Sequence, residues 1–289
     1  MPKSKGQAGF LIILCYFSAL CASLGVGWHF SDWHPIFVIL FADIAGTFVV
    51  WGFSFLYRNS SFYDPYWSVA PVVICLYLLW LAPLDNRSLV VSGLVAFWGI
   101  RLTYNWWRTW QGLHHEDWRY SDLRNRWGRK YPLIDLAGIH LFPTLQVFLG
   151  CLALYPAFTS GTSITYLDGI AAAVTITAIA IEMIADAQLH QFKSTREPGQ
   201  VLTSGLWAIS RHPNYMGEIL FWWGLALFGF SAVSEWWVYS GALAITLMFY
   251  FISVPLIERR HLAKRPTYQS QINSIPMIFP SIFSLRQRS

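Results

Sequence analysis

Long apolar blocks alternate with short polar segments along the whole chain. Each of eight blocks is close to the roughly 20 residues that a helix needs to cross a bilayer; the blocks cover residues 9–27, 35–57, 66–82, 88–106, 139–157, 164–186, 215–233 and 236–257. Pro71 and Pro143 lie inside or at the edge of the third and fifth blocks, so a seven-span alternative with one re-entrant segment stays open. The pattern predicts an all-α fold, a polytopic membrane helix bundle of seven to eight transmembrane helices in a single integral membrane domain over residues 1–289.

Composition agrees with a membrane protein. Of the 289 residues, 55% are hydrophobic and 12% charged, with a mean hydropathy of +0.42, whereas a soluble domain carries about 25% charged residues. The first block follows Lys3 and Lys5, as a signal peptide would, but no small-residue cleavage site precedes Trp28. We expect an uncleaved first helix, with a cleaved signal peptide as the alternative.

Basic residues gather on one side of the membrane if the N-terminus is cytosolic and eight spans alternate. The outer loops then hold only Arg87, and Arg101 lies within a span. The inner segments hold Lys3, Lys5, Arg58, Arg108, Arg119, Arg124, Arg126, Arg129, Lys130, Lys193, Arg196, Arg211, Arg259, Arg260, Lys264, Arg265, Arg286 and Arg288. This asymmetry satisfies the positive-inside rule and predicts cytosolic N- and C-termini. It accounts for the net charge of +5 without a nucleic-acid partner.

The cysteines give no sign of a metal or disulfide framework. Cys15, Cys21, Cys75 and Cys151 all lie in apolar blocks, and none forms a CxxC pair or stands at ligand spacing from a histidine. We expect them to be small packing residues, and we predict no metal site.

Three predicted cytosolic segments are long enough to hold machinery for a charged, water-soluble ligand. They are residues 107–138, residues 187–214 and a basic tail over residues 258–289. Segment 107–138 is rich in Trp, Arg and Asp. Two interpretations of it stay open: interfacial anchors that contact lipid headgroups, or a lid or cofactor contact.

Ionisable residues inside the apolar blocks point most directly to a site, because a charge at the bilayer centre costs at least about 2.5 kcal/mol. These residues are Asp43, Arg101, Glu182, Asp186 and Glu218. Glu182, Asp186 and His190 recur every four residues and so share one helical face at the predicted inner end of the sixth span. Other polar groups at the same predicted depth are Arg101, Tyr104, Asn214, Tyr215, Glu218, Glu258, Arg259 and His261. We expect the rim of a cytosol-facing cavity; the alternative is a set of interfacial residues that only satisfy helix ends.

The chemistry of this rim favours a nucleotide. Its cations are Lys193, Arg196, Arg211, Arg259, Arg260, Lys264 and Arg265. Pro213 and Asn214 at a helix start leave backbone N–H groups that suit an anion, and Trp222 and Trp223 offer flat faces for a ring. Neighbouring acids could accept hydrogen bonds from ribose hydroxyls or an amide. Because the interior is apolar, we expect the second reactant to be a lipid.

Three stretches carry a resemblance to a known superfamily: "GQVLTSGLWAISRHPNYMGEILFWWG", "ERRHLAKRPTY" and "EMIADAQLHQFKSTREPGQ". They resemble the membrane steroid 5-alpha-reductases, sterol reductases and isoprenylcysteine carboxyl methyltransferases, with DUF1295-type membrane proteins among their relatives. The likeness is good over residues 180–280 and weaker toward the N-terminus. The shared RHPxYxG core, here Arg211, His212, Pro213, Tyr215 and Gly217, does not separate reductase from methyltransferase.

The reductase branch is favoured by the residues around that core. Asn214 and Glu218 resemble the reductase pattern N-Y-x-G-[DE], and methyltransferases usually lack the acid. Glu182, Asp186 and Lys193, followed by Pro198-Gly199, resemble the reductase helix, although several reductases have Asn where Glu182 stands. The resemblance implies NADPH as cofactor, and S-adenosylmethionine in the methyltransferase alternative.

The resemblance also implies roles for individual residues. The nicotinamide and ribose would be held by Asp186, Asn214, Tyr215 and Glu218, with Glu182 beside them. The phosphates would be faced by Lys193, Arg196, Arg211 and His212. The adenosine end would be closed by Glu258, Arg259, His261 and Tyr268.

The implied reaction is hydride transfer from NADPH to a carbon–carbon double bond conjugated to a carbonyl, as in a 3-oxo-5-alpha-steroid 4-dehydrogenase. An acid or Tyr must stabilise the charge that builds on the carbonyl oxygen. The QxxE pattern that resembles this role in steroid reductases is absent from the second span. Candidates for it are Asp43, Tyr63, Asp64 and Tyr104, and Asp64 in "DPYW" is also predicted as the N-cap of the third span.

Two other classes stay open. The first is an S-adenosylmethionine-dependent methyltransferase acting on a prenylated cysteine or related lipid. The second is a transporter or scaffold, for which repeated halves and mid-membrane polar groups are typical and which the absence of a repeat disfavours. We expect a lipid-like substrate and membrane lipids as partners, with no nucleic acid and no obligate protein partner, in a bacterial inner membrane or the endoplasmic reticulum.

Overall fold

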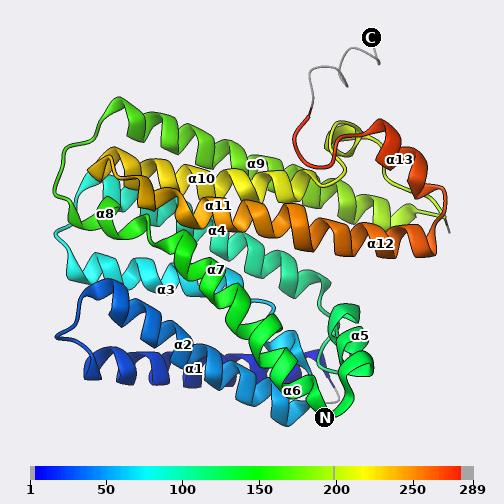
Figure 1. Ribbon diagram of the computed structural model, residues 1–289, viewed down its shortest axis with the longest axis horizontal. Coiled ribbons are helices and arrows are strands. Elements are labelled where there is room, and N and C mark those ends of the chain that lie inside the picture. Colours follow the sequence, from blue (N-terminus) through cyan, green and yellow to red (C-terminus); the bar gives the residue numbers. More distant parts are fainter. Residues whose placement is uncertain (1–3, 198, 281–289) are drawn as a thin grey trace. The chain divides into compact units, whose positions relative to one another are not determined.

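A computed structural model describes residues 4–197 and 199–280, and all regular elements of that part of the chain are helical (Figure 1). Lys3, Pro198, Arg286 and Arg288, on which the sequence interpretation drew, lie outside the described residues. Contacts between residues group the chain into two compact units, Met1–Gly161 and Thr162–Ser289. The all-α membrane fold is confirmed; the single-domain expectation stays a prediction.

Helices of spanning length make up most of both units. Among the described residues, seven helical segments are long and apolar enough to cross a membrane. Both segments that the sequence marked as doubtful, the third and the fifth, are among them. The remaining predicted span is α4 (Asn86–Thr109), whose 24 residues extend about 36 Å but include Arg101 and Arg108. Among the described residues, eight helical segments are therefore long enough to cross a membrane, and seven of them are also sufficiently apolar.

Unit 1 begins with two helical hairpins. Helix α1 (Lys5–His29) packs against α2 (Pro35–Tyr57), and α3 (Tyr66–Leu81) packs against α4; the short turn η1 (Ser60–Phe62) joins the hairpins. The ends of these helices follow from local sequence. The Asp85 side chain caps α4 in a reciprocal capping box with Ser88, and Pro35 opens α2 while Arg58 closes it in the left-handed region at φ 53°.

The rest of unit 1 is an interrupted helix. It runs through α5 (Trp118–Trp127), η2 (Gly128–Lys130), α6 (Tyr131–Ile134), a π-helical stretch η3 (Asp135–Leu141), α7 (Phe142–Cys151) and α8 (Leu154–Thr159). The interruptions fall near Pro132 and Pro143, where the missing N–H disturbs the helical ladder. Helix α7 packs against α2 and α3 and so covers the interior of the unit.

Contacts at one end of unit 1 agree with the predicted alternation of the helices. The Lys5 ammonium donates to the Trp107 carbonyl oxygen at 2.7 Å, and the Asn59 amide donates to the Leu113 carbonyl oxygen at 2.9 Å. The start of α1, the end of α2 and the segment that follows α4 therefore lie together. The alternating topology predicts this, because it assigns all three segments to the same side of the membrane.

Unit 2 is built on two helices that pack along much of their length, α9 (Tyr166–Thr195) and α10 (Pro213–Val233) (Figure 1). Glycines allow this close approach. A Cβ placed on Gly217 would lie 2.4 Å from the Glu182 Cγ atom, and one on Gly224 would lie 2.2 Å from the Thr175 hydroxyl. Small residues at such positions let helix backbones come close inside a membrane.

The remainder of unit 2 folds back on α10. Between α9 and α10 lies η4 (Gly205–Ala208), and after α10 come η5 (Trp236–Tyr239), α11 (Ser240–Met248), a π-helical stretch η6 (Phe249–Ser253), α12 (Val254–Lys264) and α13 (Tyr268–Ser274). The described part of the basic tail predicted after residue 258 is folded. Tyr268, Gln271, Ile275 and Ile278 are buried, because this segment packs into unit 2 as helix and turn.

Candidate functional site

The polar end of unit 2 is where α9 ends, α10 begins and α12 meets α13. All the residues that the sequence assigned to a cofactor belong to this unit, namely Glu182, Asp186, Lys193, Arg196, Arg211, His212, Asn214, Tyr215, Glu218, Glu258, Arg259, His261 and Tyr268. The contacts below show that they divide into a buried clamp, a group lining the start of α10 and a set of exposed cations.

The buried clamp centres on Arg211, whose side chain is only 7% exposed. Its Nε donates to the Glu258 Oε1 atom at 2.7 Å and its Nη2 to Oε2 at 3.4 Å. Its Nη1 donates to the carbonyl oxygens of Ile272 (3.0 Å) and Ile275. The backbone N–H of Arg211 donates to the Pro276 carbonyl oxygen at 2.9 Å. Arg211 thus ties the segment before α10 to α12 and to the end of α13, which makes it a positioning residue rather than an exposed phosphate contact.

His212 and Tyr215 extend the clamp to the start of α10. The His212 Nε2 atom lies 3.0 Å from the Glu258 Oε1 atom, so one carboxylate serves both Arg211 and His212. The rings of His212 and Tyr215 are stacked with 5.5 Å between centroids, and the Tyr215 ring lies 4.6 Å from that of Phe249 in η6. Rotation of these two rings is therefore restricted by neighbours on both sides.

Asn214 presents a buried acceptor at the start of α10. Its side-chain oxygen is inaccessible to solvent and finds no hydrogen-bond partner among the described residues. One turn further, the Trp222 indole N–H donates to the Glu218 Oε1 atom at 2.9 Å, and Glu182 of α9 lies against Gly217. Buried oxygens without a donor are rare in native proteins, so Asn214 is suited to accept a hydrogen bond from a ligand.

Solvent exposure rises along the last turns of α9. Glu182 is buried, Asp186 is half-buried, and His190 is exposed. Lys193 and Arg196 beyond them are exposed, as is Arg259 on α12. These side chains form the cationic edge that the sequence predicted, and their exposure leaves them accessible to an anion.

The C-terminal helix covers one side of the clamp. The rings of His261 and Tyr268 lie 4.9 Å apart, and Tyr268 is only 4% exposed. Burial, with a further contribution from the Glu258 carboxylate, raises the pKa of Tyr268 to about 12. Its hydroxyl is therefore neutral at physiological pH and can donate a hydrogen bond.

The residues proposed for catalysis lie in unit 1, and two of them fall outside its buried interior. Tyr104 is 62% exposed on α4. Asp64 is half-buried, and its carboxylate accepts from the Tyr120 hydroxyl at 2.5 Å and from the Trp106 indole N–H at 3.4 Å. The N-cap expectation for Asp64 is wrong: Pro65 occupies the N-cap position of α3, because Asp64 instead joins α5 and α4 to this turn.

Asp43 and Tyr63 are the two catalytic candidates that the structure buries, and Asp43 is the acid of the two. It is 7% exposed, and its position on α2 is about 12 Å from Pro35 along the helix axis. The Tyr66 hydroxyl donates to the Asp43 Oδ1 atom at 2.8 Å, whereas Oδ2 has no hydrogen-bond partner among the described residues. A Cβ on Gly46 would lie 2.7 Å from the Tyr66 hydroxyl, so this glycine provides the space for it. The sequence analysis did not identify Tyr66 as the partner of Asp43. The available sign of a close neighbour was Gly46, three positions after Asp43, where a side chain would collide with the Tyr66 hydroxyl.

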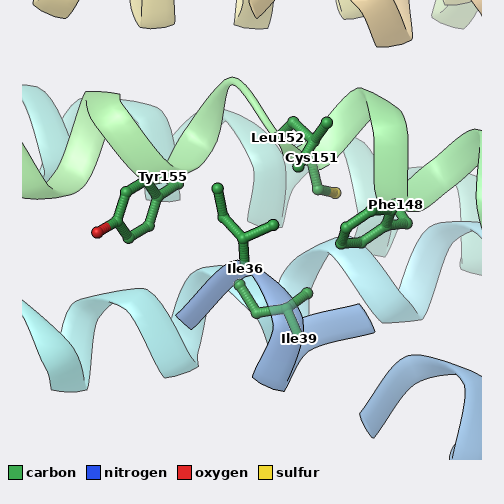
Figure 2. A pocket seen from close by; sticks show the side chains of 6 residues that line it. All are labelled: Ile36, Ile39, Phe148, Cys151, Leu152 and Tyr155. Carbon is green, nitrogen blue, oxygen red and sulfur yellow. The ribbon is translucent and has the colours of Figure 1, made fainter. Parts of the chain in front are cut away.

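An apolar pocket lies on the same helix, one turn before Asp43. Its lining consists of Ile36 and Ile39 from α2, Phe148 and Cys151 from α7, Leu152, and Tyr155 from α8. Figure 2 shows the two isoleucines pointing toward the segment that carries Cys151 and Tyr155. Unit 1 thus holds a small apolar depression on the same helix as the buried acid–tyrosine pair.

The family described as "Protein of unknown function (DUF1295)" matches residues 50–274, and the chain belongs to this family. An uncharacterized protein of Schizosaccharomyces pombe (strain 972) is 27% identical over 292 aligned positions, which cover 88% of this chain and 83% of that protein. No solved structure matches the chain.

Proposed function

We propose that this protein is a membrane-embedded, NADPH-dependent reductase of a carbon–carbon double bond conjugated to a carbonyl in a lipid. The observation that carries the proposal is the Asp43–Tyr66 pair, a carboxyl and a phenol hydrogen-bonded to each other inside the apolar interior of unit 1. A carboxyl group that is buried in the membrane without a neighbouring cation has a lower free energy in its neutral, protonated form than as a carboxylate. A neutral carboxyl group can donate a hydrogen bond.

The pair fits the electronic demand of such a reduction. When bound, NADPH supplies a hydride, which adds to the carbon far from the carbonyl and leaves negative charge on the carbonyl oxygen. Asp43 would stabilise this oxygen by donating a hydrogen bond from Oδ2, while the Tyr66 hydroxyl, which donates to Oδ1, holds the carboxyl in place; a donor already in place at that position lowers the barrier.

The polar end of unit 2 fits the cofactor. The buried Asn214 oxygen could accept from the carboxamide of the nicotinamide, and the stacked rings of His212 and Tyr215 provide flat surfaces beside it. Lys193, Arg196 and Arg259 are exposed and available to phosphates. In this arrangement Arg211 acts through Glu258 by fixing the site, not by binding phosphate itself.

The methyltransferase alternative uses the same end of unit 2 with S-adenosylmethionine. Methyl transfer to a thiolate or carboxylate has no need of a proton donor beside the lipid, so it leaves Asp43 and Tyr66 without a role. This difference is the reason for our preference for reduction.

A ligand titration tests the cofactor. Purified protein in detergent should be stabilised against thermal unfolding by NADPH, by about 2.7 kcal/mol at 100 times the dissociation constant. Asp186→Ala and Asn214→Ala should each abolish this stabilisation without reducing expression. Asn273→Ala, at an exposed position on α13, is the matched control and should retain it. Stabilisation by S-adenosylmethionine alone would reject the reductase.

A further inference from the structure

Exposed cations gather where the chain turns between α5 and α6, two helices that pack against each other in unit 1 (Figure 1). The turn is made by Gly128, whose φ of 48° lies in the left-handed region that favours glycine. Arg126, Arg129 and Lys130 are exposed on either side of it, and Trp127 between them is 43% exposed. We call these four side chains the basic corner.

Buried contacts hold the basic corner in place. The Arg124 guanidinium donates to both carboxylate oxygens of Glu116, at 2.6 and 2.8 Å, and lies 4.7 Å from the centroid of the Tyr131 ring. On α5, the buried Tyr120 hydroxyl donates to the Asp64 carboxylate at 2.5 Å. Both helices are therefore attached to the rest of unit 1, and the corner needs little ordering when a ligand binds to it.

The charges of the basic corner are not neutralised by these contacts. In the part of the chain that the structure describes, none of its three cations forms an ion pair. The other two arginines of α5 do form ion pairs, Arg119 with Asp117 at 2.8 Å and Arg124 with Glu116 at 2.6 Å. The one acid on α5 is Asp122. Three cations beside a single acid leave this surface positively charged.

An apolar helix surface begins directly after the basic corner. Residues 131–159 contain no Lys or Arg and belong to a segment that is long and apolar enough to cross a membrane. Leu133, Ala137 and Leu145 are exposed and are separated by multiples of four residues, so they follow one side of the helix that leaves the corner. Cations and tryptophan at the end of a span are typical of the depth of lipid headgroups.

We propose that the basic corner binds the headgroups of anionic phospholipids in the adjacent leaflet, with their acyl chains against Leu133 and Leu145. A phosphatidylcholine headgroup carries a choline cation beside its phosphate, whereas phosphatidylglycerol keeps a net negative charge. The positive charge of the corner therefore favours phosphatidylglycerol. Each Lys or Arg close to an anionic membrane surface contributes about a fivefold gain in binding.

The neighbours of the cations favour a lipid over a water-soluble phosphate. The exposed indole of Trp127 suits the boundary between headgroups and acyl chains, and Leu133, 69% exposed, lies three residues beyond the last cation. A free phosphate or a nucleotide phosphate would use neither side chain. A phospholipid would contact both of them together with the cations.

Native mass spectrometry of the full chain in detergent tests the preference for an anionic headgroup. Wild-type protein should bind its first phosphatidylglycerol molecule at least about tenfold more tightly than its first phosphatidylcholine molecule, and Arg126→Gln with Lys130→Gln should remove most of this preference. The matched control is Arg58→Gln with Arg108→Gln. It removes the same charge from exposed positions at the ends of α2 and α4 and should retain at least half of the preference.

Fluorescence locates the bound lipid at the basic corner. The difference in emission between wild-type protein and Trp127→Phe isolates the Trp127 indole. Phosphatidylglycerol with brominated acyl chains should quench this emission more strongly than brominated phosphatidylcholine. Equal quenching by the two lipids would overturn the proposal, as would an equal loss of headgroup preference in the two double variants.

Two further measurements separate the lipid from other anions. Millimolar inorganic phosphate should not displace phosphatidylglycerol, and displacement would show that the corner recognises phosphate alone. NADPH should stabilise the Arg126→Gln, Lys130→Gln variant as it stabilises wild-type protein. A loss of stabilisation by NADPH confined to this variant would assign the corner to the cofactor and overturn the proposal.

Discussion

Replacing Arg211 by methionine is expected to destabilise the protein by about 3–5 kcal/mol, the cost of leaving one member of a buried ion pair without its partner. The substitution leaves the Glu258 carboxylate, 12% exposed, with only His212 beside it. It also removes the donors to the carbonyl oxygens of Ile272 and Ile275. Equilibrium unfolding in mixed detergent micelles measures the change in free energy of unfolding.

A mutant cycle separates the ion pair from other effects of the substitution. The double variant Arg211→Met with Glu258→Met should be less destabilised than the sum of the two single variants, because neither charge is then left alone. Arg259→Met, at an exposed position on the same helix as Glu258, should change stability by no more than about 0.5 kcal/mol. An Arg211→Met variant as stable as wild type would show that the clamp does not hold the end of unit 2 together.

Gly217→Ala should destabilise unit 2 by about 1–3 kcal/mol, the usual cost of forcing a group into a filled interior. The added Cβ would lie 2.8 Å from the Ala178 carbonyl oxygen as well as 2.4 Å from the Glu182 side chain. A carbonyl oxygen of the opposing helix cannot rotate away, so α9 and α10 must separate. We expect a lower unfolding temperature together with weaker stabilisation by NADPH, since Glu182 and Asn214 lie on the helices that move apart.

Gly169→Ala is the matched control and should have the opposite sign. Gly169 lies on α9, and a Cβ there meets no atom within 4 Å. Alanine is favoured over glycine in a helix by up to about 1 kcal/mol, so this variant should be as stable as wild type or slightly more stable. If both variants behaved alike, the close contact at Gly217 would not be what joins the two helices.

The helices could be predicted from sequence because the bilayer imposes a length and an apolar character that are local properties. Residues 35–57, for example, were predicted as a span and form α2 over the same positions. The segment from Trp118 to Thr159 was harder, because prolines and π-helical turns divide it and their effect on the backbone depends on packing against α2 and α3.

Polar partners were less predictable than helices, since charge indicates that a group needs a counterpart without indicating which one. The resemblance implied a phosphate contact for Arg211, whereas in the structure its donors bond to the Glu258 carboxylate and to carbonyl oxygens more than 60 positions later in the chain. Asp43 was recognised as an intramembrane acid, whereas its pairing with Tyr66 depends on how α2 and α3 face each other.

The folded C-terminal segment has a consequence for genetics. A stop codon at position 272 would remove none of the residues assigned to cofactor or substrate, yet it would delete all three carbonyl oxygens that Arg211 contacts beyond α12. Such an allele would be lost through degradation of a poorly assembled product by the cell's proteases rather than through a defect in chemistry. Truncations that remove residues 272–276 should therefore behave as null alleles with little protein left in the membrane.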